Sequence, residues 1–280
     1  MRVIELKKAF CNKGFIAGLS IGLLLMICGT YTIMGYINSY FLNIAPMDKA
    51  YREVEEVSFL QAWMGGDPFT VFTNTFYLIL FPLIAALPFA SSGLKEKLLG
   101  YDKMVITKAG RNQYLNAKFE AVFLSGGVVV SVPSVLSLMF AMTRFPLIPE
   151  TASNYQTGVN VNSLWADIFY HQPLRYALMY IALDFIAGGA LACLTLSLAY
   201  YVKSTFKLMT LPLLAGLVSV ELFMYLPGDM HKISFLLPYW YVDPVSNADL
   251  PWVAVAVSII LITLISRLFW CYVGKKRDCI

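Results

Sequence analysis

Apolar residues gather along this chain into long runs separated by shorter polar and charged segments. A helix needs about 20 predominantly apolar residues to cross the hydrocarbon core of a bilayer. Six runs reach that length, at about residues 14–37, 72–92, 119–143, 176–200, 208–226 and 252–273. The pattern predicts an all-α integral membrane protein with six transmembrane helices, in a single domain that covers residues 1–280.

A short segment of mixed character, residues 1–13, precedes the first run. Its apolar members are Val3, Ile4, Leu6 and Phe10, and its charged members are Arg2, Glu5, Lys7 and Lys8. Such a segment predicts an amphipathic helix that lies on the membrane surface. A lipoprotein signal cleaved before Cys28 is the alternative, but signal peptidases prefer a small residue where this chain has Ile27.

Composition agrees with a membrane protein. Hydrophobic residues make up 59% of the chain and charged residues 14%, whereas soluble domains have about 45–50% and about 25%. One globular core does not accommodate this excess of apolar side chains, and a bilayer does. The formal net charge of +4 is too small to indicate a nucleic-acid partner.

The lysines and arginines predict the orientation. With the N-terminus inside, 16 of the 21 basic residues fall in cytoplasmic segments: Arg2, Lys7, Lys8, Lys13, Lys95, Lys97, Lys103, Lys108, Arg111, Lys118, Lys203, Lys207, Arg267, Lys275, Lys276 and Arg277. Basic residues in short loops stay on the cytoplasmic side. We therefore expect both termini to be cytoplasmic.

Sequence motifs for catalysis are missing. The chain has no GxxxxGK[ST] phosphate loop, no HExxH motif and no nucleophile elbow. Its two histidines, His171 and His231, fall in predicted external loops, and its five cysteines form no CxxC pair. We expect a protein that is not an enzyme and that holds no metal ion or cofactor of its own.

Two acids fall inside predicted spans, Asp184 in the fourth and Glu221 in the fifth. A rise of about 1.5 Å per residue places Asp184 roughly 12 Å and Glu221 roughly 7 Å below the outer surface. Ionisable groups at such depth often mark a transport pathway. Either the two acids line one cavity open to the outside, or each bonds to a neighbouring helix or to headgroup water.

Glycines repeat at every fourth position at the start of the first span, as Gly14, Gly18 and Gly22. Glycines one turn apart form a flat stripe against which another helix packs closely. The partner helix belongs either to this chain or to another subunit.

The predicted cytoplasmic loop 93–117 interleaves apolar residues with bases. The candidate contact residues are Tyr101, Met104, Val105, Ile106, Lys108, Arg111 and Tyr114. An apolar stripe among charges indicates either a short helix that docks onto another protein or a basic segment that rests on anionic lipid.

The region from the second to the third span resembles permeases of type-2 ABC exporters from Gram-positive bacteria. The shared features are Pro82 and Pro88, Gly100-Tyr101, Arg111 with Tyr114 and Lys118, Gly126-Gly127, and Pro133. The strings LDFIAGGALACLTLSLAYYVKS and KISFLLPYWYVDP are also similar to that family. Where relatives usually carry a first arginine in the loop, this chain has Lys108.

This resemblance implies a coupling helix between the second and third spans and small elements between the fifth and sixth. It also implies a dimer, with a second permease copy or a paralogue, that binds two ATP-binding cassette ATPase subunits. ATP and Mg²⁺ would then be bound by those subunits.

The predicted function is the membrane subunit of an ATP-driven exporter in the plasma membrane of a bacterium, with an amphipathic substrate such as a peptide (for example a bacteriocin), a drug or a lipid. An ion-coupled secondary transporter that uses Asp184 and Glu221 is the alternative, and a membrane scaffold without transport is a third.

Overall fold

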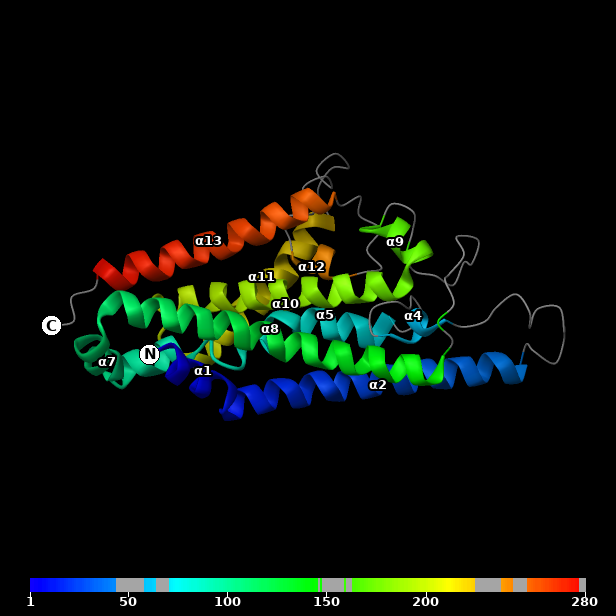
Figure 1. Ribbon diagram of the computed structural model, residues 1–280, viewed down its shortest axis with the longest axis horizontal. Coiled ribbons are helices and arrows are strands. Elements are labelled where there is room, and N and C mark those ends of the chain that lie inside the picture. Colours follow the sequence, from blue (N-terminus) through cyan, green and yellow to red (C-terminus); the bar gives the residue numbers. More distant parts are fainter. Residues whose placement is uncertain are drawn as a thin grey trace.

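The computed structural model describes residues 1–43, 58–63, 71–145, 147, 159, 163–224, 238–243 and 251–276, and the regular elements in these ranges are all helices. Six helices run roughly along the long axis of the molecule (Figure 1): α2 (Lys13–Asn43), α5 (Val71–Ala86), α8 (Arg111–Arg144), α10 (Pro173–Leu198), α11 (Thr205–Met224) and α13 (Trp252–Lys276). The most extensive contact is between α8 and α10. The predicted all-α fold is confirmed.

Short helices lie at the two ends of this bundle. They are α1 (Arg2–Phe10), α4 (Phe59–Ala62), α6 (Ser92–Leu98), α7 (Tyr101–Ala109), α9 (Ala166–His171) and α12 (Pro238–Val242). In Figure 1, α1 and α7 lie near the C-terminal end of α13, and α4 and α9 lie near the opposite end. The segment 1–13, predicted to be an amphipathic helix, is thus helical over most of its length.

Three helices in the described ranges are long and apolar enough to cross a membrane: α8, α10 and α13. A fourth span is present if α1 and residues 13–29 of α2, which are bent by 47° relative to each other, count as one. This number is smaller than the six spans predicted from the sequence.

The difference in span number arises partly at α5. This helix has 16 residues, fewer than the about 20 that a span requires. The predicted span continued to residue 92, but the helix ends at Ala86 and turns follow. Pro88 explains the end, because proline disfavours helical backbone at the residue before it. In α11 the side chains that the structure describes without a gap, Thr205–Val218, form an apolar stretch shorter than a span requires.

Glycine pairs let α8 and α10 approach closely. A Cβ atom on Gly126 would fall against Ala192, 3.0 Å from the carbonyl oxygen of Ala85 and 3.1 Å from that of Gly188. Next to this crossing, the rings of Phe123 and Phe185 meet edge to face at 6.2 Å. The crossing lies in the middle of the bundle and leaves no room for a side chain at Gly126.

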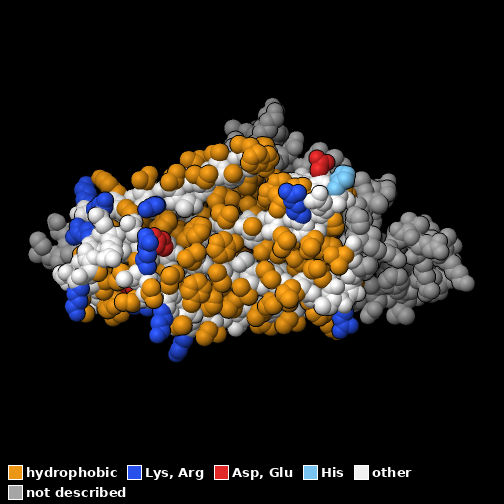
Figure 2. All heavy atoms as spheres, viewed as in Figure 1, with side chains coloured by type: hydrophobic (Ala, Val, Ile, Leu, Met, Phe, Trp, Pro, Cys, Tyr) orange, Lys and Arg blue, Asp and Glu red, His pale blue; other side chains and the backbone are white. Residues whose placement is uncertain are grey.

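The sides of the bundle are apolar. Figure 2 shows hydrophobic side chains over the middle of the molecule, with lysines and arginines gathered towards one end. Along α13, large apolar residues such as Val257, Leu264 and Leu268 are exposed. Exposed apolar surface of this extent is rare in soluble monomers and is typical of helices that contact lipid.

Two glycines with positive φ separate the helices of the loop 93–117. Gly100 (φ 68°) lies between α6 and α7, and Gly110 (φ 82°) lies between α7 and α8. Residues with a Cβ atom rarely adopt this conformation, so glycine allows the sharp changes of direction. The predicted loop is therefore a helical hairpin, α6–α7, that leads directly into α8.

Candidate functional site

The α6–α7 hairpin exposes large apolar side chains at its tip. Leu98 is 64% exposed, Leu99 82% and Met104 61%. Lys95, Lys103 and Lys108 surround them and are also exposed. We call Leu98, Leu99 and Met104 the hairpin tip. Exposed leucines and methionine among lysines form a surface that suits either a protein partner or anionic lipid, the two alternatives left open by the sequence.

The contact residues predicted from the sequence divide into two groups. Met104 and Lys108 are exposed, whereas Val105 and Ile106 are partly buried against a cluster that contains Leu115 and Phe119 of α8. Val105 and Ile106 therefore hold α7 on α8. Leu98 and Leu99 belong to the same apolar pattern in the sequence but were not among the predicted contact residues, because exposure at a hairpin tip depends on the turn at Gly100.

Arg111 and Tyr114 form hydrogen bonds to other helices at the base of the hairpin. Arg111 donates a hydrogen bond to the carbonyl oxygen of Lys275 at 2.6 Å, which ties the start of α8 to the end of α13. Trp270 of α13 donates to the carbonyl oxygen of Leu115 at 3.1 Å in the same region. The base of the hairpin is thus fixed to a long helix from the end of the chain.

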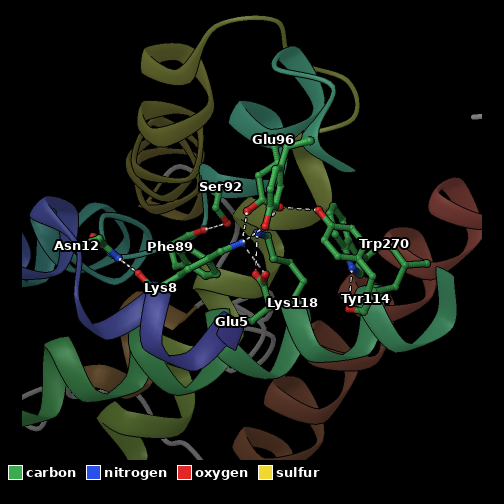
Figure 3. A network of polar contacts seen from close by, with 11 residues as sticks. Glu5, Lys8, Asn12, Phe89, Ser92, Glu96, Tyr114, Lys118 and Trp270 are labelled. Atoms are coloured by element: carbon green, nitrogen blue, oxygen red, sulfur yellow. Dashed lines mark hydrogen bonds and ion pairs between the residues drawn. The ribbon is translucent and has the colours of Figure 1, made fainter. Parts of the chain in front are cut away.

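Beneath the hairpin lies a partly buried group of charged side chains, which we call the charged cluster: Glu5, Lys8, Glu96 and Lys118 (Figure 3). The Lys118 Nζ atom lies 2.9 Å from a carboxylate oxygen of Glu5 and 2.7 Å from one of Glu96. The side chains of Lys118 and Glu5 are fully buried. The cluster joins α1, α6 and α8 at one point.

Lys8 completes the charged cluster from the other side. Its ammonium lies 3.0 Å from Glu5 and 3.5 Å from Glu96, and it donates to the hydroxyl of Tyr101 at 3.3 Å. Tyr114 donates to Glu96 at 2.8 Å. Two acids and two bases alternate, so each buried charge has an opposite charge beside it.

The charged cluster shifts the pKa values of Glu5 and Lys8 away from their ordinary values. Burial raises the pKa of the Glu5 carboxyl, but Lys118 and Lys8 outweigh that effect and hold the pKa below its usual value. For Lys8, burial lowers the pKa of the ammonium, whereas Glu5, Glu96 and Tyr101 raise it to a value above the ordinary one. Both groups are therefore charged at neutral pH.

The sequence places Glu5 and Lys8 among the charged residues of a surface helix, and Lys118 among the basic residues that predict the orientation. It does not predict the cluster, although two spacings in the sequence agree with it. Glu5 and Lys8 are three residues apart, and Lys118 follows Tyr114 by four, so each pair shares one helix face. The third element, Glu96 of α6, has no such local signal.

The glycine stripe of α2 packs inside the chain. A Cβ atom on Gly14 would fall against the carbonyl oxygen of Leu87, on Gly18 it would lie 2.8 Å from Val129, and on Gly22 it would lie 2.7 Å from Pro133. The stripe therefore faces α8 and the turn that follows α5. The sequence left open whether the partner helix belongs to this chain or to another subunit. In the structure the stripe packs against helices of this chain.

The two predicted intramembrane acids differ in their surroundings. Asp184 of α10 is 6% exposed, and its Oδ1 atom has no hydrogen-bond partner among the described residues. Glu221 of α11 is exposed. Neither of them lines the cavity described next, so the structure does not bring them together in it.

An apolar cavity of about 390 Å³ lies between α5, α10 and α11, with α12 and α13 at its margin. Its walls include Phe81, Leu194, Leu198, Leu211 and Leu217. This volume lies in the range of small-molecule sites.

Within the residues that the structure describes, no three His, Cys, Asp or Glu side chains are grouped so as to hold a metal ion. Comparison with protein-family models, with curated proteins and with solved structures found no match to this chain. The function is therefore argued from the chain's own residues.

Proposed function

We propose that this chain is the membrane-spanning permease subunit of an ATP-driven exporter of the type-2 class. In this proposal α2, α5, α8, α10, α11 and α13 each cross the plasma membrane of a bacterium, and both termini are cytoplasmic. A second permease copy or a paralogue completes the transport path. Two separate ATP-binding cassette subunits bind ATP and Mg²⁺ and hydrolyse the nucleotide.

The observation that carries the proposal is the α6–α7 hairpin. It presents an apolar tip among lysines, and its base is joined to α1 and α8 by the charged cluster. A partner that moves the tip would move α8 with it, because buried ion pairs and the side chains of Val105 and Ile106 connect the two. The hairpin thus has the properties of a coupling element.

The substrate in this proposal is amphipathic. The lining of the described cavity is apolar, and the apolar helices offer few charges to a hydrophilic solute. A peptide, a drug or a lipid fits this description.

The docking prediction uses Leu99→Asp combined with Met104→Asp. Both side chains are exposed in the isolated chain, so the variant is expected to fold and insert as the unchanged protein does. At an interface the same aspartates would be buried without partners, which typically costs several kcal/mol at a contact centre. We expect the permease purified from its native membranes to lose the copurifying P-loop ATPase and its hydrolysis of ATP.

Tyr201→Asp is the matched control, because Tyr201 is also a large exposed side chain, 62% exposed, and lies outside the hairpin. It is expected to retain the ATPase. If the tip variant keeps a full complement of active ATPase, the hairpin is not the docking element. A wild-type preparation that contains no P-loop ATPase would contradict the exporter proposal itself.

An ion-coupled secondary transporter is the second candidate, and Asp184 is the observation that favours it. A carboxylate oxygen buried in a long helix without a hydrogen-bond partner is costly, and such groups are often sites of proton or cation binding.

Asp184→Asn separates the two candidates, because it keeps the side-chain shape and removes the charge. An ATP-driven exporter is expected to keep its transport rate within about twofold and to show the same pH dependence. The measurement is substrate flux in liposomes, with and without ATPase and with and without a pH gradient. Flux that is driven by the gradient alone, and abolished by Asp184→Asn, would establish the ion-coupled alternative.

A further inference from the structure

The walls of the cavity between α5, α10 and α11, as far as the described residues form them, lack charged side chains. The residues that line it are aliphatic, aromatic, proline or glycine, among them Leu194, Leu198, Leu211 and Gly216. A polar ligand would lose its hydration in this space and gain no hydrogen bond from a side chain, which is unfavourable. A hydrocarbon chain gains about 0.8 kcal/mol for each methylene group that it buries.

Gly216 leaves part of this space open. A Cβ atom built on Gly216 meets no atom within 4 Å, in contrast to Gly126 at the α8–α10 crossing. The glycine lines the cavity and lies about two and a half turns after Lys207 on α11. A larger side chain at this position would enter the cavity without displacing the backbone of another helix.

Basic residues lie in the chain between Leu198 and Leu211, two residues that line the cavity. Leu198, which lines it, is the last residue of α10, and the turn that follows carries Lys203. Lys207 precedes Leu211 by one helical turn, so the two share a face of α11. Lys203 and Lys207 are exposed, and no ion pair to either is formed by the described residues.

A third base reaches the same turn from α6. The Nζ atom of Lys97 lies 3.5 Å from the carbonyl oxygen of Tyr200, which places Lys97 beside the start of α11. The N-terminal turn of α11 begins here at Thr205, and the amide groups of a helix start favour a negative charge. Positive charge therefore collects where the apolar cavity ends.

We propose that this cavity binds one anionic phospholipid. An acyl chain lies between α5, α10 and α11, and the phosphate group lies at Lys97, Lys203 and Lys207. The lipid comes from the membrane leaflet that faces these lysines. The same cavity supports the amphipathic substrate of the proposed function, but lipid binding requires neither nucleotide nor an ATPase and is measured without transport.

The experiment titrates the purified chain in detergent with phosphatidylglycerol, and separately with phosphatidylcholine that has the same acyl chains, and counts bound lipid by native mass spectrometry. We expect one phosphatidylglycerol molecule per chain, bound at least about 30-fold more tightly than phosphatidylcholine. A base near an anionic lipid contributes about 1 kcal/mol. Lys203→Gln combined with Lys207→Gln is therefore expected to weaken phosphatidylglycerol binding roughly 30-fold and to leave phosphatidylcholine binding unchanged.

Gly216→Leu fills the cavity and is expected to weaken the binding of both lipids by about tenfold, because it displaces methylene groups. Lys275→Gln combined with Lys276→Gln removes two exposed bases from the end of α13 and is the matched control, with unchanged binding expected. Equal binding of the two lipids by the unchanged protein would overturn the proposal. So would phosphatidylglycerol binding that Gly216→Leu and the Lys203/Lys207 variant leave intact.

Discussion

Replacing Lys118 with methionine is expected to lower the free energy of unfolding by about 3–5 kcal/mol, because it leaves buried carboxylates without their counter-charge. Lys118 is fully buried between Glu5 and Glu96, and only Lys8 would remain to neutralise both acids. A loss of this size corresponds to a fall in melting temperature on the order of 10 °C. The measurement is thermal unfolding of the purified chain in mild detergent.

The ion pair between Arg2 and Glu120 provides a matched control. It joins the same two helices, α1 and α8, at 2.9 Å, but both side chains are exposed. Arg2→Met is expected to change stability by less than about 1 kcal/mol, since exposed ion pairs contribute little. Glu5→Gln added to Lys118→Met removes one uncompensated acid and is expected to restore part of the loss. Equal melting temperatures for Lys118→Met and Arg2→Met would contradict the assigned burial.

Acid should weaken the same contact. The folded-state pKa of Glu5 lies below its ordinary value, so ionised Glu5 stabilises the fold at any pH above that ordinary value. This stabilisation is lost as the pH falls through the folded-state pKa. Melting curves recorded from neutral pH downwards are expected to show a decline that Glu5→Gln reduces.

Gly126→Leu is expected to lower the free energy of unfolding by about 3 kcal/mol or more, a loss at least comparable to that of Lys118→Met. Its Cβ atom alone would crowd Ala192 and the carbonyl oxygens of Ala85 and Gly188. Two of these three groups are backbone, which shifts only if a whole helix moves. We expect separation of α8 from α10 and a strongly lowered melting temperature in detergent.

Gly216→Leu makes the same chemical change where a new Cβ atom meets nothing within 4 Å. It is expected to be neutral or to raise stability by up to about 1 kcal/mol, because leucine has the higher helix propensity. The comparison of the two variants isolates packing from the general effect of removing a helical glycine. If Gly126→Leu and Gly216→Leu lowered the melting temperature equally, the α8–α10 crossing would have room for a side chain at Gly126, contrary to the structure.

The all-α fold was predictable because apolar run length and helix propensity are local properties. The predicted helix within residues 1–13 follows from the same local pattern and is present, and of the alternatives left open for residues 93–117 the structure has helices there. The number of spans was not fixed by the same pattern. Pro88 lies in an apolar run that continues past it, and run length alone does not show that the helix ends at Ala86.

The site was predictable only in part. Tyr101, Met104 and Tyr114 were placed near a candidate contact by their mixed apolar and basic neighbours. The charged cluster was missed because Glu5, Glu96 and Lys118 come from three helices, and ion pairs between distant segments depend on how those helices pack. The suggestion that Asp184 and Glu221 line one cavity relied only on their depth below the outer membrane surface. Which neighbour each side chain faces depends on the rotation of its helix about its own axis, and the sequence does not give that rotation.

The charged cluster also constrains the order in which the protein is completed. Glu5 and Lys118 are separated by 113 positions in the chain, and at about 5–20 residues per second Lys118 leaves the ribosome roughly 6 to 23 seconds after Glu5. During this interval Lys8 is the only member of the cluster already made that can neutralise Glu5, and water must solvate the pair. Burial of α1 is therefore a late event in biogenesis, after α6 and the start of α8 have been synthesised.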